Sequence, residues 1–189
     1  SDIPQIINAG HALGDLVPKG EDLEALRGLL RPPAAAPLAD GALGLELAAT
    51  LLNFGMTTEA QGLIERAAAA GAPAVMLHRA RAQLFTERKE RDEAIAEWTA
   101  LIELDPAGPG AYEARARLRM YDLLKKPGAA KQIVADLTRA IERGHSDEDL
   151  LLLRAGLCFL FQKRAAAVKD VAEYTLRYSS FDFARQGIG

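Results

Sequence analysis

The residues that most often carry catalysis are scattered along this chain. His11, His78 and His145 are far apart and do not have the spacing of a metal site. The acidic residues 147–149 beside His145 are better explained as a helix start, because carboxylates stabilise a helix N-terminus. No phosphate-binding Gly-x-x-x-x-Gly-Lys loop and no Gly-x-Ser-x-Gly nucleophile turn is present. We therefore expect no catalytic residue, metal or cofactor, and predict that the chain is not an enzyme.

The single cysteine, Cys158, cannot form an internal disulfide, and its apolar neighbours indicate a buried, inert thiol. The fold therefore does not depend on an oxidising compartment, and the compartment is left open, with the cytoplasm favoured over the periplasm. No apolar run reaches about 18 residues, so we expect no membrane span.

Charge excludes the usual form of nucleic-acid binding. The chain has 23 basic and 26 acidic residues, interleaved along its length, for a net charge of -3. A nucleic-acid binder normally has a basic stripe. The nearest candidate is Arg115, Arg117 and Arg119, which alternate with apolar residues and have Glu113 beside them. A solvated helix face explains them better, so we expect no nucleic-acid partner.

Composition and periodicity predict an all-α protein. Hydrophobic residues make up 49% of the chain and aromatics only 6%, so the core must come mainly from Ala, Leu and Ile. Ala and Leu are strong helix formers. We expect a helical hairpin in residues 1–30, a Pro/Ala-rich linker at 31–40 and a tail at 183–189. Between them, helical patterns run in pairs over residues 41–54 and 57–70, 73–88 and 91–104, 109–125 and 128–143, and 147–161 and 165–178. Thr57, Asp92 and Ser146 are placed where helix N-caps belong.

The sequence repeats itself at a fixed period. Ala48, Ala82 and Ala116 are evenly spaced, and Ala60 and Ala94 have the same spacing. Small residues at these places let two antiparallel helices approach closely, and larger apolar residues fill the space between pairs. The period, about 34 residues, is that of tetratricopeptide repeats, which are helix–turn–helix units. The alternative is an ordinary helical bundle whose spacing is coincidental.

Two stretches carry a clear resemblance to the tetratricopeptide-repeat family. In residues 75–108 the small, aromatic, small, aromatic, apolar and proline positions of the family are filled by Ala82, Phe85, Ala94, Trp98, Leu101 and Pro106. Residues 41–74 match through Leu47, Ala48, Leu51, Gly55, Ala60, Ile64 and Ala67, with the proline one place late at Pro73.

The two later units depart from the family pattern. The third, 109–148, carries about six extra residues around 125–128 and has Arg119 where an aromatic is expected. The fourth, 149–182, fits through Leu152, Gly156 and Phe159, while its second helix matches poorly. The resemblance thus predicts an α-solenoid of about four repeats, with atypical terminal units.

The resemblance also implies a binding surface, because in this family the first helix of each pair lines a concave groove. Carried over residue by residue, the groove is apolar at both ends and mixed in charge in the middle, and it lacks the clustered Lys, Arg and Asn that hold a peptide carboxylate. The alternative is that Leu45 and Leu52 pack under the N-terminal hairpin. The predicted groove residues are Leu45, Ala49, Leu52, Asn53, Arg79, Gln83, Glu87, Glu113, Arg117, Tyr121, Leu150, Leu153, Leu157 and Leu160.

The fourth unit is apolar nearly all round, from Leu150 to Phe161. A helix of this kind is normally buried on more than one side. The tail with Phe181 and Phe183, a downstream domain or a second copy of the chain could cover it, so homo-oligomers are possible.

Two functions follow from the resemblance. The first is a scaffold that binds a protein or peptide partner in the groove, which a Leu153→Asp variant should abolish. The second is the N-terminal accessory or oligomerisation region of a larger bacterial enzyme, such as a glycosyltransferase or sulfotransferase. The bacterial source is suggested by 16 Arg against 7 Lys.

Overall fold

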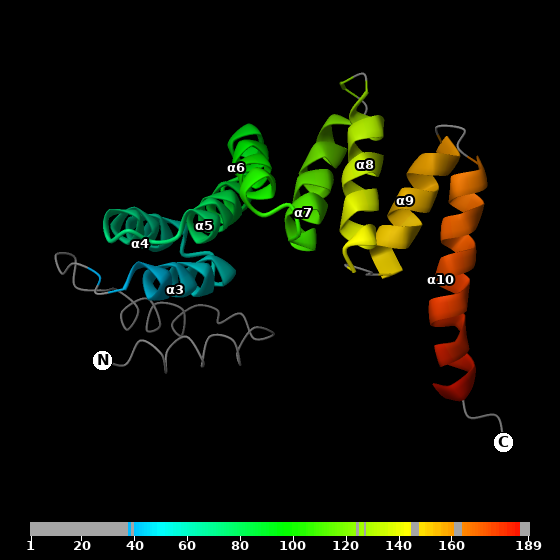
Figure 1. Cartoon of the computed structure of the whole chain (residues 1–189), viewed down its shortest axis with the longest axis horizontal. Helices are drawn as coiled ribbons and strands as arrows, with labels where there is room; N and C mark the ends of the chain where they lie inside the picture. The colour runs from blue at the N-terminus through cyan, green and yellow to red at the C-terminus, as the bar shows by residue number, and fades with distance from the viewer. Residues whose placement is uncertain are drawn as a thin grey trace. The chain divides into compact units, whose positions relative to one another are not determined.

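The computed structural model describes residues 38, 40–123, 125, 126, 128–144, 148–160 and 164–185 (Figure 1). For residues 148, 164 and 178–185 it describes the backbone alone. The predicted hairpin 1–30, nearly all of the linker, the predicted cap Ser146 and most of the tail lie outside the described residues. The chain divides into two compact units, one up to Leu101 and one from Ile102, and each is described by itself.

The first unit contains two helical pairs. They are α3 (Gly41–Asn53) with α4 (Thr57–Ala69), and α5 (Ala74–Glu87) with α6 (Arg91–Leu104), whose last turn enters the second unit. All four predicted ranges are confirmed, each boundary to within one residue. The predicted caps at Thr57 and Asp92 are wrong, because both residues lie inside the first turn of their helices.

The second unit contains the other two pairs. They are α7 (Pro109–Arg119) with α8 (Ala129–Glu142), and α9 (Glu148–Leu160) with α10 (Arg164–Arg185). The helix predicted at 109–125 ends as a single 3-10 turn, η1 (Met120–Asp122). The helix predicted at 165–178 extends seven residues further. The described residues thus form eight α-helices and no strand, which confirms the all-α prediction.

The ends of the helices follow local rules. The Asp40 carboxylate caps α3 by accepting from the backbone N–H groups of Ala42 and Leu43, at 2.8 and 3.4 Å. After α3 the chain turns through Gly55, whose φ of +69° glycine adopts without strain. Lys89 stands at the equivalent place in the next repeat and adopts a φ of +62°, although it carries a side chain. The repeat therefore imposes one turn geometry on two different residue types.

Small residues stand where helices of the first unit meet. Ala48, Ala60 and Ala67 are completely buried beside Leu51 and Leu63. A Cβ added at Gly41 would lie 2.8 Å from the carbonyl oxygen of Ala67, so only glycine fits this contact.

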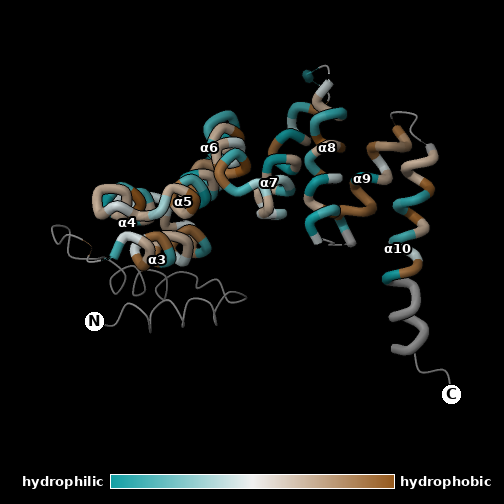
Figure 2. The backbone as a smooth tube through the Cα atoms, in the orientation of Figure 1, coloured by the Kyte–Doolittle hydropathy of each residue, from teal (hydrophilic) through white to brown (hydrophobic). Residues whose placement is uncertain are grey.

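The core of the second unit joins three helices. Ile133 and Leu137 of α8 pack with Ala116 of α7 and with Leu150 and Leu157 of α9. The hydropathy colouring in Figure 2 shows α9 as a largely apolar helix. The predicted burial of Cys158 is confirmed.

Candidate partner-binding surface

The first helices of the four pairs can be aligned on one buried alanine each. Ala48, Ala82 and Ala116 keep the regular spacing of the repeat, and Ala155 follows Ala116 at a longer interval. The additional residues lie between α7 and α8, where η1 and its loop replace a short turn. This alignment defines which face of each first helix is equivalent from pair to pair.

The alignment corrects the predicted register of α9. Leu152, Gly156 and Phe159 match interior family positions in the sequence, yet Leu152 is 44% and Phe159 65% exposed, and a Cβ at Gly156 would meet open space. The buried positions are taken instead by Leu150 and Leu157, which were predicted to line the groove. About six extra residues were predicted before α9, whereas the aligned alanines show five, so the predicted register was wrong by one residue.

The open face of α9 therefore consists mostly of residues that were not predicted. Leu160, which was predicted, is 69% exposed and belongs to it. Leu153 is half-buried and packs against the core of the second unit. We define the α9 face as Leu152, Gly156, Phe159 and Leu160, and sequence reasoning missed all but the last.

Two of the four predicted residues of the first pair lie in the core. Leu45 and Leu52 are buried members of the hydrophobic cluster of the first unit, so neither is open to a partner in this structure. Ala49 is half-buried and Asn53 is exposed at the end of α3.

The predicted residues of the two middle pairs lie at the surface. Arg79 and Glu87 of α5 are exposed, and Gln83 between them is half-buried. In η1, the turn that follows α7, Tyr121 is 63% exposed. The Nε atom of Arg117 donates to the carboxylate of Glu113 one turn earlier, at 2.7 Å. These faces are polar, as predicted, whereas the equivalent α9 face is apolar.

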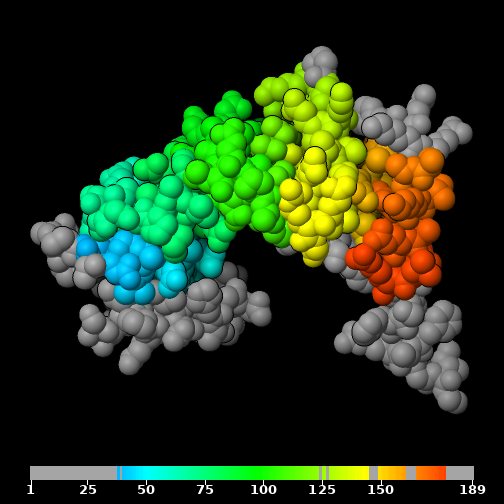
Figure 3. Space-filling view, viewed as in Figure 1, coloured from blue at the N-terminus to red at the C-terminus, as the bar shows by residue number. Residues whose placement is uncertain are grey.

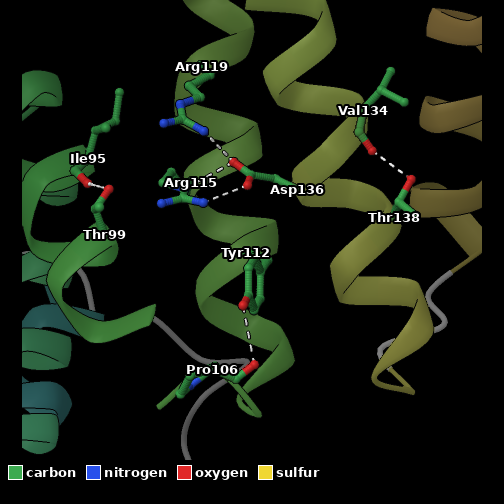
Figure 4. Close-up of polar contacts among 9 residues, drawn as sticks. All are labelled: Ile95, Thr99, Pro106, Tyr112, Arg115, Arg119, Val134, Asp136 and Thr138. Carbon is green, nitrogen blue, oxygen red and sulfur yellow. Dashed lines mark hydrogen bonds and ion pairs between the residues drawn. The ribbon is translucent and has the colours of Figure 1, made fainter. Parts of the chain in front are cut away.

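The other two arginines of α7 point to the inside of their helical pair. Arg115 donates from Nε and Nη2 to the two carboxylate oxygens of Asp136 in α8, at 3.0 and 2.7 Å, and Arg119 donates to the same carboxylate at 2.6 Å (Figure 4). Asp136 is buried. The predicted solvated face is thus wrong for Arg115 and Arg119, since their side chains join α7 to α8.

The fourth pair repeats this bridge. Arg154 of α9 donates to both oxygens of the buried Asp170 in α10, at 2.9 and 2.6 Å. Arg115 and Arg154 each stand directly before the aligned alanine, and Asp136 and Asp170 are separated by one repeat period. This recurrence was a signal available in the sequence. The bridge between Arg154 and Asp170 fixes the rotation of α9 and so determines which residues of α9 reach the surface.

A second set of contacts lies in the third pair, near the start of α7 and the end of α8. The Tyr112 hydroxyl donates to the carbonyl oxygen of Pro106 at 3.3 Å (Figure 4). The Arg143 guanidinium lies 5.1 Å from the centre of the Tyr112 ring, which is a favourable cation–π arrangement.

No group of three His, Cys, Asp or Glu side chains that could hold a metal ion occurs among the described residues. In the same part of the chain, no helix is both long and apolar enough to cross a membrane.

Comparison with solved structures gives close matches in fold at low sequence identity. A MamA structure from Desulfovibrio magneticus RS-1, residues 41 to the end, aligns over 100% of this chain and 98% of its own, with 11% identity and a TM-score of 0.64. Another MamA structure aligns over 98% of both chains, with 13% identity and a TM-score of 0.65.

Human IFIT1, in a structure described as a dimer with PPP-AAAA, matches over 89% of this chain and 39% of its own. The identity is 18% and the TM-score 0.62. No family model matches the sequence, and no curated protein matches it as a relative.

MamA and IFIT1 are tetratricopeptide-repeat proteins, and the likeness to them shows an all-α solenoid of tetratricopeptide-like repeats. The predicted fold class is confirmed. The alternative of an accessory region in a larger enzyme stays a prediction, because no comparison supports it.

Proposed function

Because the chain has the tetratricopeptide-repeat fold, we propose that it is a scaffold that binds a protein or peptide partner on the α9 face. Repeats of this fold expose one face of each first helix, and extended or helical peptides are typical ligands of such surfaces. The proposal concerns binding alone and requires no chemistry at the surface.

The exposure of Phe159, beside Leu152 and Leu160, is the observation that carries the proposal. Burying such side chains contributes about 1.5–3 kcal/mol each, so leaving them in water forgoes a substantial stabilisation. Contiguous exposed apolar patches on folded proteins mark interaction sites. Gly156 adds a gap between Leu152 and Phe159, into which a partner side chain fits without meeting a Cβ.

The neighbouring chemistry indicates what the partner presents. The equivalent face of α7 offers the Glu113–Arg117 ion pair, and the exposed Tyr121 follows in η1. A partner that contacts both faces would place apolar anchors on α9 and polar or charged side chains on α7. No cluster of Lys, Arg and Asn occurs on these faces in the described residues, which disfavours a partner held by its terminal carboxylate.

The test is a binding measurement with a variant of the α9 face. A partner isolated with the wild-type chain would be titrated against Phe159→Asp and, as a matched control, against Leu104→Asp, which changes another exposed apolar side chain at the end of α6. We expect Phe159→Asp to weaken binding at least about thirtyfold, the effect of losing a hot-spot residue. The control should bind like the wild type.

Phe159→Asp is a better variant than Leu153→Asp. Leu153 packs against the core, so its replacement would destabilise the fold as well as any interface. Phe159 is largely exposed, and circular dichroism should show unchanged helicity for its variant. Binding of Phe159→Asp at wild-type strength would refute the proposed site.

A further inference from the structure

The outer side of α10 carries a second apolar surface, on a different helix from the α9 face. Val168, Val171 and Leu176 are 68%, 49% and 81% exposed. Ala165, Val168, Ala172 and Thr175 recur at alternating spacings of three and four residues, so they share one helix face. No charged side chain lies within this face among the described residues. We define the α10 stripe as Ala165, Val168, Val171, Ala172, Thr175 and Leu176.

The repeat register shows what kind of surface the stripe is. Asp136 of α8 corresponds to Asp170 of α10. Each carboxylate accepts two hydrogen bonds, in a bidentate arrangement, from one arginine on the first helix of its pair. In the same register Val134, Leu137 and Ile141 correspond to Val168, Val171 and Thr175.

In α8 these three positions support the next helix. Leu137 belongs to one buried cluster with Leu150 and Leu157 of α9, and Val134 and Ile141 are partly buried against that cluster. Figure 4 shows Val134 on the side of α8 opposite to Asp136, away from α7. The α10 stripe is therefore the face on which a helix stacks in the preceding repeat, and here it is exposed. In the space-filling view α10 lies at the surface (Figure 3).

The charges along the edge of the stripe indicate which helix fits. Lys169 is exposed at this edge, and Glu173, whose carboxylate also pairs with Arg177 of the same helix, follows one turn later on the same side of α10. In a parallel pair of α10 helices, Lys169 of one copy would face Lys169 of the other. In an antiparallel pair related by a two-fold axis near residues 171 and 172, Val168 lies opposite Thr175, and Lys169 comes near Glu173 of the other copy. The stripe is thus self-complementary in the antiparallel arrangement.

We propose that two copies of this chain associate through antiparallel pairing of their α10 helices along the α10 stripe. A two-fold interface of this kind uses the same patch on both copies. The small side chains of Ala165, Ala172 and Thr175 permit close approach, while Val168 and Val171 supply the buried apolar area. One helix pair buries less than the roughly 1,200–2,000 Å² of a stable interface, so the dimer should form and dissociate with concentration.

The first test is sedimentation equilibrium of the full chain over about 1 µM to 1 mM, the range of weak association. The average mass should rise from 20.3 kDa toward twice that value. Val168→Glu should remain at the monomer mass with unchanged helicity, since this side chain is exposed in the free chain. Phe159→Glu, on the α9 face, should associate like the wild type, which separates this proposal from the partner-binding site.

The second test checks the antiparallel arrangement of the two α10 helices by disulfide crosslinking. The native Cys158 is buried and should leave the wild type uncrosslinked. Mixing Val168→Cys with Thr175→Cys chains should give a mixed disulfide dimer. Ala166→Cys, exposed but outside the stripe, is the matched control and should crosslink far less.

Three results would overturn the proposal. They are a monomer mass at every concentration, dimers of Val168→Glu equal to those of the wild type, and crosslinking through Ala166→Cys as efficient as through the mixed pair. A monomer that instead bound a foreign helix on the stripe would assign the same surface to a different occupant.

Discussion

The first and third helical pairs join their two helices at equivalent positions by opposite chemistry. In the α3–α4 pair the positions are held by Leu47 and Leu63, which are both buried. In the α7–α8 pair the same positions hold Arg115 and Asp136, which form a bridge inside the pair. Burial of apolar surface stabilises the first joint, and paired charges with satisfied hydrogen bonds hold the second.

The second and fourth pairs show that the change is not confined to one repeat. In the second pair Glu97 stands at the position of Asp136 and contacts Nδ1 of His78 at 2.6 Å. In the fourth pair the bridge is between Arg154 and Asp170. The backbone arrangement thus tolerates either chemistry, provided that each buried polar group has a partner.

The two kinds of joint differ in what they specify. An apolar joint tolerates small rotations of one helix, because the hydrophobic effect has no direction. A bidentate arginine–carboxylate bridge requires a defined geometry. We infer that the bridges of the second unit fix the rotation of α9 and α10, and with it the residues that these helices expose.

The largest expected effect comes from breaking the ionic joint on one side. Asp136→Ala would leave Arg115 and Arg119 without their shared carboxylate inside the α7–α8 pair. Removing one partner of a buried bridge costs about 3–5 kcal/mol. Urea unfolding followed by circular dichroism should show this loss, and hydrogen exchange should place it in the second unit.

A triple variant separates the charge from the contact in that joint. Arg115→Leu, Arg119→Leu and Asp136→Leu together replace every member of the bridge by an apolar side chain, and apolar replacement of a buried bridge is often neutral or stabilising. The triple variant should therefore be more stable than Asp136→Ala. Equal loss of stability in the two variants would show that the bridge does more than fill the space between α7 and α8.

Loss of the apolar packing between α3 and α4 should destabilise the first unit, and for a different reason. Leu63→Ala removes a buried side chain and leaves a cavity, at a cost of about 2–4 kcal/mol. Hydrogen exchange should increase in α3 and α4 first. Leu63→Met, which nearly conserves volume, should cost less than about 1.5 kcal/mol. A similar loss for both variants would contradict the packing explanation.

Substitutions in the turns after α3 and α5 should change the stability less, and the two changes should have opposite signs. Left-handed backbone strains any residue with a side chain by about 1–2 kcal/mol, partly offset by the larger unfolded-state entropy of glycine. Lys89→Gly should thus stabilise the chain by about 1 kcal/mol, and Gly55→Ala should destabilise it by a similar amount. A Cβ at Gly55 would meet nothing within 4 Å, so its effect comes from the backbone alone. Thermal unfolding of both variants measures the two signs.

Helix positions were predictable from the sequence because prolines, glycines and apolar spacing mark them locally. The alignment of the fourth pair was not, since the run Leu150–Leu153 fits any rotation of α9 by hydrophobicity alone. Its rotation depends on Arg154 reaching Asp170 on another helix, 16 residues away. The same reason hid the roles of Arg115 and Arg119, whose alternation with apolar residues resembles a solvated face. Contacts between helices decide these cases, and a single helix pattern does not contain them.

The smallest expected effect gives the sharpest comparison, because the two variants compared replace the same residue type on the same helix. Arg117 and Arg115 each have a carboxylate oxygen at 2.7 Å, but the Arg117 side chain is 49% exposed and that of Arg115 only 12%. An exposed i,i+4 ion pair contributes about 0.3–0.5 kcal/mol, since water screens it and both side chains lose freedom. Arg117→Ala should therefore hardly change the urea midpoint, whereas Arg115→Ala should lower it clearly. If the two variants lost equal stability, burial would not be what distinguishes the ionic joint from the surface pair, and the contrast between the first and third pairs would need another cause.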